Sequence, residues 1–272
     1  MAEALVVYEK ENGIAVIRLN RPEKMNAVND EMQSQLGEII SDTMLNDDVR
    51  VVILTGTGKA FCGGTDVSGL ARSQENAAKG TASAQQTPRD WSLLQNSPLP
   101  PWRFTRIPKP TIAAVNGAAV GMGAEWAIHC DIRIASENAR FGWVFSQRGL
   151  VPDTGAGPFI LPFIVGMSKA LELMYSGEIV DAQEALRIGL VSTVVPQGRL
   201  LSVAKEMAAK LMRGAPLSLK GIKELTYGAL QWTPQAHRTE TARRFSEAAQ
   251  SEDGREGIMA FREKRPPAWK GR

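Results

Sequence analysis

Few residues in this chain are suited to disulfide formation or metal binding. Its 272 residues include only two cysteines, Cys62 and Cys130, and two histidines, His129 and His237. Both cysteines lie in apolar or glycine-rich surroundings, so no disulfide framework is expected and a reducing cytoplasm is favoured. No group of residues has the ligand spacing of a metal centre, and the sequence predicts no metal site.

The chain also lacks a long hydrophobic run and a large net charge. No stretch of about 18 apolar residues occurs, so no membrane span is expected, and the N-terminus lacks the pattern of a secretion signal. The formal net charge is +3, which argues against a nucleic-acid partner, although the pI of about 8.9 suits an anionic ligand such as a nucleotide phosphate. The hydrophobic content of 43% is sufficient for a large core.

Strand and helix patterns alternate along the chain, which predicts a parallel sheet with helical crossovers. The expected strands are 5–10 and 14–19, joined by a hairpin turn at 11–13, then 49–54, 111–115 and 132–135. The expected helices are 29–44, 122–129, 168–176, 182–188 and 200–213, and residues 216–263 are expected to be almost wholly helical. Residues 71–101 are rich in Ser, Gln, Ala, Thr and Pro, which predicts a mobile loop with a short helix near Trp91.

Two glycine-rich turns, each following an apolar segment, are the most informative features. Residues 115–125 are an apolar run that ends in glycines and is followed directly by Glu125, and residues 60–67 repeat this arrangement after the buried strand. Glycine lets a ligand approach the backbone closely, and the first N–H groups of a helix can bind negative charge. Two such turns would supply an oxyanion hole beside a proton-transfer group. The alternative is that both turns only permit tight packing and that Glu125 only complements the helix dipole.

These turns belong to a set of motifs that resembles the crotonase family, also called the enoyl-CoA hydratase/isomerase superfamily, over nearly the whole chain. The motifs, in family order, are 20–22 with 26–27, 58–66, 109–117, 121–125, 130–131, 141–142, 149–152, 182–185 and 189–191. The resemblance implies an α/β fold: a ββα superhelix over residues 1–200, which holds the CoA-thioester site, and a helical trimerisation region over 201–272. It further implies a homotrimer or dimer of trimers, an acyl-CoA thioester substrate, and no cofactor beyond the coenzyme A moiety.

The resemblance assigns chemistry to the two turns. Thr65 and Met122 occupy the two oxyanion-hole positions, where backbone N–H groups stabilise the oxygen of a thioester enolate. Glu125 occupies the position of the first catalytic glutamate of enoyl-CoA hydratases, and the alternative for it is a helix-cap acid.

The second hydratase glutamate is replaced by Phe145, which cannot transfer a proton. Eight residues later, Asp153 occupies a position similar to that of a proton-transferring aspartate in dienoyl-CoA isomerases and of the nucleophilic aspartate in 4-chlorobenzoyl-CoA dehalogenases. We therefore expect Asp153 to act with Glu125 as an acid/base pair; the alternative is an acid that caps the following turn. The dehalogenase interpretation is less favoured because the loop histidine of that family is absent, and His129 is expected to be a packed core histidine.

Other positions match the CoA-binding region of the family. Lys24 and Ala27 fall in the adenine and phosphate region, Gly63 and Asp66 belong to the first turn, and Phe261 and Lys264 match a C-terminal CoA-contact motif. Asp66 is expected mainly to hold the turn in place. Four aromatic residues are candidates for lining an acyl pocket, although ordinary core packing explains them equally well: Trp91, Trp126, Trp143 and Phe145.

The sequence thus predicts an acyl-CoA enzyme of the enoyl-CoA hydratase/isomerase type, with Glu125 and Asp153 in proton transfer. Two alternatives remain open. One is a double-bond isomerase, C–C hydrolase or dehalogenase-like enzyme that acts on a cyclic or aromatic CoA ester. The other is a CoA-ester-binding protein with weak catalysis, which the loss of a carboxylate at Phe145 suggests.

Overall fold

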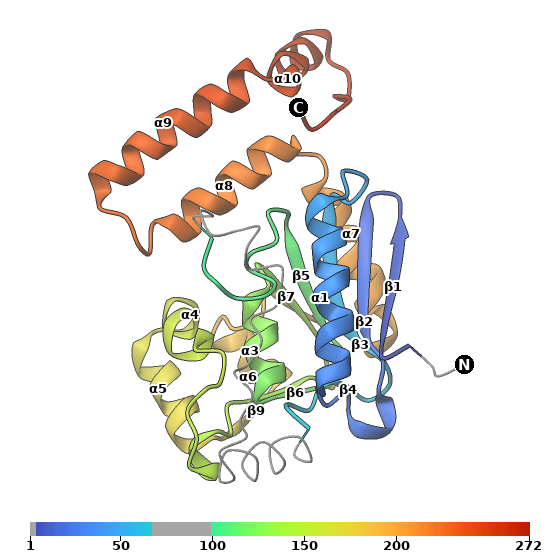
Figure 1. The fold of residues 1–272 in the computed structure, drawn as a ribbon, viewed down its shortest axis with the longest axis vertical. Coiled ribbons are helices and arrows are strands. Elements are labelled where there is room, and N and C mark those ends of the chain that lie inside the picture. The colour runs from blue at the N-terminus through green and yellow to red at the C-terminus, as the bar shows by residue number, and fades with distance from the viewer. Residues whose placement is uncertain (1–3, 67–98) are drawn as a thin grey trace.

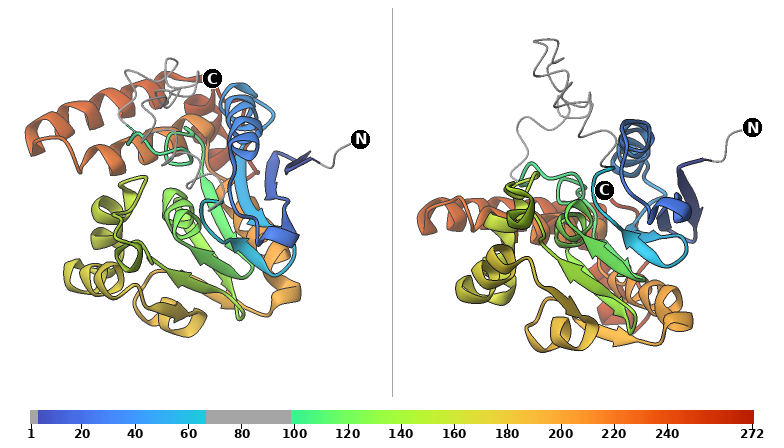
Figure 2. Two further views of the ribbon diagram at one scale, coloured as in Figure 1. Left: turned by 60° about the horizontal axis from the view of Figure 1, so that its bottom comes forward. Right: turned by 90° about the horizontal axis from the view of Figure 1, so that it is seen from below.

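The structure, a computed structural model, describes residues 4–66 and 99–272, and two β-sheets form its centre (Figures 1 and 2). The larger sheet has the order β1-β2-β3-β5-β7-β10. Its strands are β1 (Val6–Glu11), β2 (Ile14–Leu19), β3 (Val51–Gly56), β5 (Thr111–Val115), β7 (Ile132–Ser136) and β10 (Thr193–Val195). The smaller sheet has the order β4-β6-β8-β9. Its strands are β4 (Ala60–Cys62), β6 (Ala118–Val120), β8 (Arg140–Gly142) and β9 (Ile179–Asp181).

Helices pack around the sheets and extend beyond them at the C-terminus. The α-helices are α1 (Asp30–Leu45), α3 (Met122–His129), α4 (Ala156–Val165), α5 (Met167–Ser176), α6 (Ala182–Arg187), α7 (Leu200–Leu211), α8 (Pro216–Gly228), α9 (Pro234–Gln250) and α10 (Glu252–Glu263). Short 3-10 turns are η1 (Pro22–Lys24), η3 (Ser146–Arg148) and η4 (Gln197–Arg199). The predicted helices of the core are present, whereas α4 was not predicted. The expected loop at 71–101 and Trp91 lie almost entirely outside the described residues.

A repeated strand pair builds the core. In turn, β3, β5 and β7 of the larger sheet are each followed by a short strand of the smaller sheet, β4, β6 and β8, and neighbouring copies run parallel in both sheets. This arrangement confirms the superhelical core that the resemblance implies. The short strands were missed in the sequence because three residues show too little alternation to identify a strand.

The buried strands of the larger sheet divide their side chains between two cores. Alternate residues of β3 point to opposite faces, as in any strand: Val52 and Leu54 join the main core, and Val51 and Ile53 join a second cluster. Helix α7 closes that second cluster with Leu200, Ala204 and Ala208. Burial on both faces explains why the sequence of β3 is a continuous apolar run. Helix α7 packs against the larger sheet. The C-terminal helices that extend beyond the sheets are therefore α8, α9 and α10.

A buried ion pair attaches α8 to the core. Lys223 Nζ lies 2.9 Å from Asp131 Oδ2, and the Tyr227 hydroxyl donates to Asp131 Oδ1 at 3.1 Å. The Thr111 amide also donates to Asp131 Oδ2, at 2.8 Å. The lysine side chain is only 5% exposed, so its charge depends on this carboxylate for compensation.

We expect Asp131→Asn to lower the free energy of unfolding by about 3 kcal/mol, because the substitution leaves the Lys223 ammonium buried without its counter-charge. Urea denaturation followed by circular dichroism would measure the change. Lys205→Gln is the matched control: it removes the pair with Glu11, in which both side chains are largely exposed, and little change is expected. Equal stability of Asp131→Asn and the wild type would contradict the prediction.

Among residues 4–66 and 99–272, no helix is both long enough and apolar enough to span a bilayer. Both cysteines are buried and free. Helix α9, although 17 residues long, contains no buried residue, and the views in Figures 1 and 2 show it projecting with α8 and α10 beyond the sheets.

Candidate active site

The two glycine turns lie side by side. Strands β4 and β6 are parallel neighbours, so their carboxyl ends, which lead into the two turns, share one edge of the smaller sheet. A Cβ added to Gly64 would lie 3.1 Å from the Val120 carbonyl oxygen and 3.9 Å from the Met122 nitrogen. Thr65 Oγ1 lies 3.9 Å from Met122 Sδ. The segments that carry the two expected oxyanion donors are thus in contact.

The amides of Thr65 and Met122 are not used by the backbone ladder. The Val28 amide donates to the Gly64 carbonyl, and the Asp66 amide donates to the Val28 carbonyl, at 2.8 Å each. This pairing holds the turn through the residues on either side of Thr65. Met122 is the first residue of α3 and has no acceptor within the helix. Within the described part of the chain, neither N–H has a hydrogen-bond acceptor.

Glycine is required where α3 meets β4. A Cβ on Gly123 would lie 2.0 Å from the Cys62 carbonyl oxygen, a distance that no side chain tolerates. Gly64 and Gly121 also adopt φ values of 106° and 55°, in the region that glycine occupies without strain. These glycines are therefore needed for packing and for backbone conformation, which is compatible with an anion site at the same turns.

Three hydrogen-bond donors surround the Glu125 carboxylate. Trp143 Nε1 donates to Oε1 at 2.8 Å, Thr154 Oγ1 lies 2.5 Å from Oε2, and the Gly157 amide donates to Oε2 at 3.0 Å. The side chain is fully buried. Burial raises the pKa of Glu125, and the hydrogen bonds from Thr154, Gly157 and Trp143 oppose that rise.

Gly157 leaves no space for a side chain beside this carboxylate. A Cβ there would lie 2.4 Å from Glu125 Oε1 and 3.2 Å from Trp143 Nε1. We expect Gly157→Ala to displace Glu125, to destabilise the protein by about 1–3 kcal/mol, and to lower turnover. Thermal denaturation and steady-state kinetics would measure both effects.

Gly198→Ala is the control for this substitution, because a Cβ at Gly198 meets nothing within 4 Å. If Gly157→Ala and Gly198→Ala behaved alike in stability and turnover, Glu125 would not be confined in the way the structure indicates.

The second acid, Asp153, faces the first glycine turn. Thr65 Oγ1 donates to Asp153 Oδ2 at 3.4 Å. The side chain is exposed, yet partial removal of water by its neighbours raises the pKa of Asp153, against the lowering effect of the Thr65 hydrogen bond. Asp153 also acts on Glu125 by raising its pKa through like-charge repulsion. The structure thus brings both predicted acids to the two turns.

Phe145 lies against the second turn. Its Cζ is 3.9 Å from the Cβ position of Gly121, and the side chain is buried. A phenyl ring therefore stands beside the N-terminus of α3, where the family pattern places a second glutamate. Trp126 and Trp143 are buried in the main core, with Trp126 packed edge-to-face on Phe104. Core packing therefore explains these two tryptophans better than a role in an acyl pocket.

Sequence reasoning missed the partners of Glu125. The sequence suggested Trp143 as a pocket residue or a core aromatic but not as a partner of Glu125, and it gave no role to Thr154. His129 lies on the same helix as Glu125, one turn later, and its Nε2 is 3.2 Å from Thr154 Oγ1. In the sequence, the i, i+4 spacing of Glu125 and His129 on one predicted helix was the one signal that His129 lies close to Glu125. As predicted, His129 is a buried core residue.

Several predicted CoA-contact residues lie near the first turn. Lys24 ends η1, and the Ala27 carbonyl accepts from Arg21 Nη1 at 2.7 Å. The same guanidinium nitrogen lies 3.1 Å from Asp66 Oδ2. The Gly63 amide donates to the Met25 carbonyl at 2.8 Å. The predicted structural role of Asp66, holding the turn, agrees with this ion pair.

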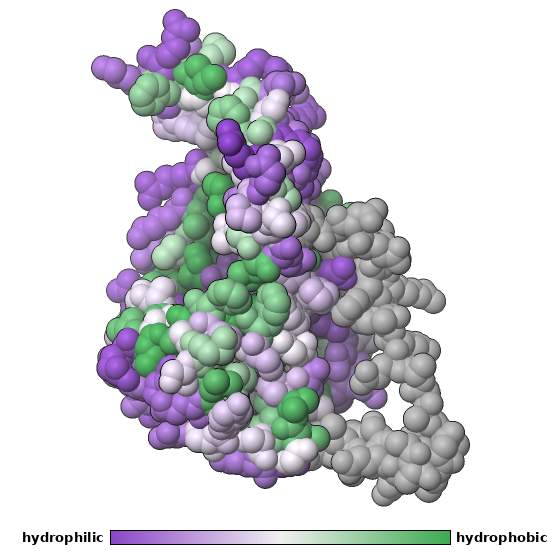
Figure 3. All heavy atoms as spheres, turned by 90° about the vertical axis from the view of Figure 1, so that its left-hand side faces the viewer, coloured by the Kyte–Doolittle hydropathy of each residue, from purple (hydrophilic) through white to green (hydrophobic). Residues whose placement is uncertain are grey.

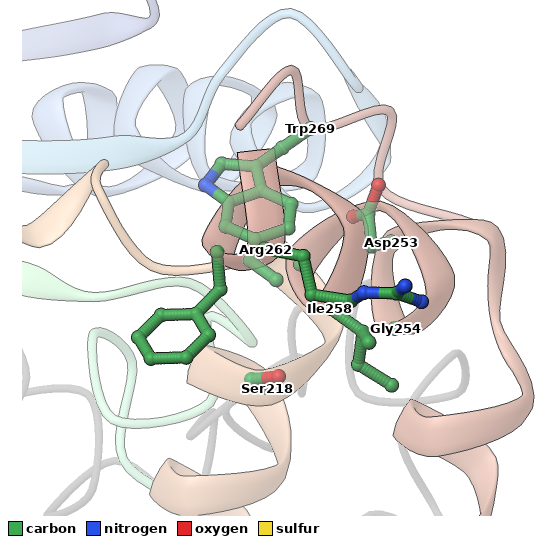
Figure 4. Close-up of a pocket in the computed structure, with 9 residues that line it drawn as sticks. Ser218, Asp253, Gly254, Ile258, Arg262 and Trp269 are labelled. Atoms are coloured by element: carbon green, nitrogen blue, oxygen red, sulfur yellow. The ribbon is translucent and has the colours of Figure 1, made fainter. Parts of the chain in front are cut away.

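Phe261 and Lys264 lie elsewhere in the chain. Helix α10 is at one end of the molecule, whereas the segment between β2 and α1, which contains η1, is at the other (Figure 1). Phe261 is 86% exposed and lines a groove of about 420 Å³ between the start of α8 and α10. Figure 4 shows Trp269, Arg262 and Ser218 around this groove. Within one chain, the structure does not bring these two residues to the glycine turns.

The described residues contain no group of three or more His, Cys, Asp or Glu side chains that are placed to hold a metal ion. The described groups at and near the two turns include backbone amides, the carboxylates of Glu125 and Asp153, and the hydroxyls of Thr65 and Thr154.

Two adjoining glycine turns, with two carboxylates near them and a repeated ββα core around them, agree with the family that the sequence motifs resemble, and so do the comparisons with known proteins. The family model of enoyl-CoA hydratase/isomerase matches residues 9–272. The chain is 37% identical over 261 residues to the short-chain-enoyl-CoA hydratase of Clostridium acetobutylicum, with 96% of this chain and 95% of that protein covered.

Other relatives carry different activities in their names. The chain is 34% identical over 268 residues to the 1,2-epoxyphenylacetyl-CoA isomerase of Escherichia coli, with 98% of each covered. The crystal structure of an enoyl-CoA hydratase from Bacillus anthracis matches with a TM-score of 0.86 at 31% identity, over 98% of this chain and 100% of that one. The chain belongs to the enoyl-CoA hydratase/isomerase family, the crotonase superfamily, and is an acyl-CoA enzyme of that family.

Proposed function

We propose that this enzyme moves a double bond within an acyl-CoA thioester by way of an enolate. The amides of Thr65 and Met122 hold the thioester oxygen, because both are free and lie on adjoining turns. A base removes a proton from the acyl chain, the negative charge moves to the oxygen, and a proton returns at another carbon, so the product is an isomer of the substrate. Each oxyanion donor contributes about 3 kcal/mol to lowering the barrier.

One observation favours isomerisation over hydration: the acids are Glu125 and Asp153, and Phe145 stands where a second hydratase carboxylate would act on water. An apolar ring beside the second turn cannot activate a water molecule. Asp153, which contacts Thr65, supplies a carboxylate on the first turn instead. Proton removal and return require no water, so two carboxylates in these positions suffice for an isomerase.

Hydration of an enoyl-CoA through Glu125 is the second candidate, and the names of the relatives include both reactions. A C–C hydrolase, a dehalogenase-like enzyme and a CoA-ester-binding protein with weak catalysis are the remaining alternatives. A panel of enoyl-, dienoyl- and aryl-CoA thioesters, followed by chromatography and mass spectrometry, distinguishes them. An isomer of unchanged mass supports the proposal. Addition of 18 mass units, loss of halide, chain cleavage or binding without turnover would each overturn it.

For the CoA moiety, we propose that Lys24, Ala27, Gly63 and Asp66 contact the ligand at the first turn. Phe261 and Lys264 would reach such a ligand only from another copy of the chain, because α10 lies far from η1 in one copy. Lysine suits phosphate as a point charge. Lys264→Gln is expected to weaken CoA binding, which calorimetry would measure; unchanged affinity would remove Lys264 from the site.

A homotrimer or dimer of trimers is proposed as the working assembly. Apolar side chains are exposed on the face shown in Figure 3. On α4 and α5, the exposed residues include Phe159, Phe163 and Met167, and Phe245 is exposed on α9. Exposed apolar area of this kind is typical of protein–protein interfaces. Analytical ultracentrifugation would detect a trimer or hexamer, and a monomer at micromolar concentration would contradict the proposal.

A further inference from the structure

Thr154 is the centre of a hydrogen-bonded cluster behind Glu125. Its Oγ1 lies 2.5 Å from Glu125 Oε2, 3.2 Å from His129 Nε2 and 3.2 Å from the Ala156 amide nitrogen. Glu125 and His129 are both almost wholly buried. Trp102 fixes the backbone of this residue, since its Nε1 donates to the Thr154 carbonyl at 2.8 Å.

The hydrogens in this cluster can be counted. A threonine hydroxyl has one proton to donate and two lone pairs. The Ala156 N–H can only donate, so it occupies one lone pair. One proton and one lone pair remain for Glu125 and His129. One of these two groups must therefore accept from Thr154, and the other must donate to it.

Two arrangements satisfy this count. In the first, Glu125 Oε2 is unprotonated and accepts from Thr154, while His129 donates through an Nε2–H. In the second, Glu125 carries a proton on Oε2 and donates, while His129 accepts at Nε2 and carries its proton on Nδ1. His129 is neutral in both, because burial lowers its pKa to about 3.

His129 Nδ1 decides between the two arrangements. This atom is buried and has no hydrogen-bond partner among the described residues. In the second arrangement it would carry a buried N–H without an acceptor, whereas in the first it is a bare acceptor, which is the less costly of the two to leave unpaired. The first arrangement is therefore the stable one.

The two oxygens of Glu125 then differ. Oε2 already accepts from Thr154 and Gly157, whereas Oε1 accepts only from Trp143. The charged groups that act on this cluster are Asp153, which repels Glu125, and Arg103, which acts on His129. Neither contributes a hydrogen bond to Glu125, so the inequality of the two oxygens comes from the three donors.

We propose that Thr154 and His129 are positioning residues that keep Glu125 Oε2 unprotonated, so that any proton that Glu125 transfers is carried on Oε1. The inference rests on the proposed function in that Glu125 is one of its two proton-transfer groups. To that function it adds a difference between the two oxygens of the Glu125 carboxylate. This difference is set by residues other than the two proposed acids and the two proposed oxyanion donors.

The histidine tautomer tests the first step directly. The chain has only two histidines, so long-range ¹H–¹⁵N spectra of the labelled wild type contain two ring systems, and His129→Gln assigns them. We expect His129 to be the neutral Nε2–H tautomer down to pH 5. His237 is the internal reference, because its Nε2 lies 3.1 Å from the Leu225 carbonyl, which can only accept. An Nδ1–H tautomer for His129 would overturn the proposal.

Substitution of Thr154 tests the second step. In protein labelled at the glutamate carboxyl carbon, Glu125→Gln identifies the Glu125 resonance. Thr154→Val removes a donor to the ionised carboxylate, so the midpoint of the Glu125 titration is expected to rise by about 1 to 2 pH units. Thr154→Ser, which keeps the hydroxyl, is expected to restore the wild-type midpoint. A midpoint that Thr154→Val does not raise would overturn the proposal, and if this variant fails to fold, the tautomer of the wild type decides.

Activity separates this inference from the proposed function. The acid limb of kcat/KM is expected to move to higher pH in Thr154→Val, in parallel with the Glu125 titration, and to return in Thr154→Ser. A raised titration midpoint in a protein that isomerises no acyl-CoA ester would remove the proposed function and leave the positioning of Oε2 standing. If the protein isomerises an acyl-CoA ester but Thr154→Val leaves the Glu125 titration midpoint unchanged, the proposed function stands and the positioning of Oε2 is overturned.

Discussion

Asp153→Asn is expected to lower turnover on the isomerised substrate by about 10²- to 10⁴-fold, which is the range for loss of a well-placed acid/base group. Asparagine keeps the shape of the side chain and its contact with Thr65 but cannot take up a proton. The protein should fold normally, because the carboxylate is exposed and its hydrogen bond from the Thr65 hydroxyl is long, at 3.4 Å. Steady-state kinetics with CoA-ester affinity measured in parallel would show a fall in kcat with little change in binding.

Asp48→Asn is the matched control, because this acid is exposed and lies in the turn between α1 and β3, away from both glycine turns. Turnover by Asp153→Asn within a few-fold of the wild type would show that Asp153 only caps the turn before α4. The pKa of Asp153 is raised by partial removal of water, which gives a second expectation. Asp153→Asn should change the pH profile of kcat/KM relative to the wild type, because one of the two titrating carboxyl groups is then absent.

Hydration of crotonyl-CoA by the wild type is expected to be about 10²- to 10⁴-fold slower than by an enzyme that carries two glutamates in the family positions. The reason is Phe145, whose ring lies beside Gly121 and cannot act on water. Hydration consumes the conjugated enoyl thioester, so the fall in its absorbance would measure the rate. Phe145→Glu should increase hydration, because it places a glutamate at the position where the family pattern has the second hydratase glutamate.

Phe145→Leu is the control for the substitution, since it removes the ring without adding an acid. Efficient hydration of crotonyl-CoA by the wild type, unaffected by Asp153→Asn, would contradict both the role of Asp153 and the preference for isomerisation. Equal hydration by Phe145→Glu and Phe145→Leu would show that the ring itself, and not the missing carboxylate, limits the reaction.

Many elements of the fold can be predicted from local patterns in the sequence. Strand β3 is a continuous apolar run because α7 and the main core bury both of its faces, and α1 shows the period of an amphipathic helix with Met32, Leu36 and Ile40 buried. Such elements depend on residues close together in the sequence, so they can be predicted. The three-residue strands β4, β6 and β8 could not, because their pairing across the smaller sheet decides their conformation.

The candidate site divides in the same way. The sequence alone determined the family and the two glycine turns, and it predicted Glu125 and Asp153 as candidate acids, because each belongs to a short motif with fixed spacing. Only the tertiary structure showed that Trp143, Thr154 and Gly157, which lie 18, 29 and 32 residues from Glu125, donate to its two oxygens. A hydrogen bond requires its donor and acceptor to be placed to within a few tenths of an ångström. The packing of β8, α3 and α4 sets these positions.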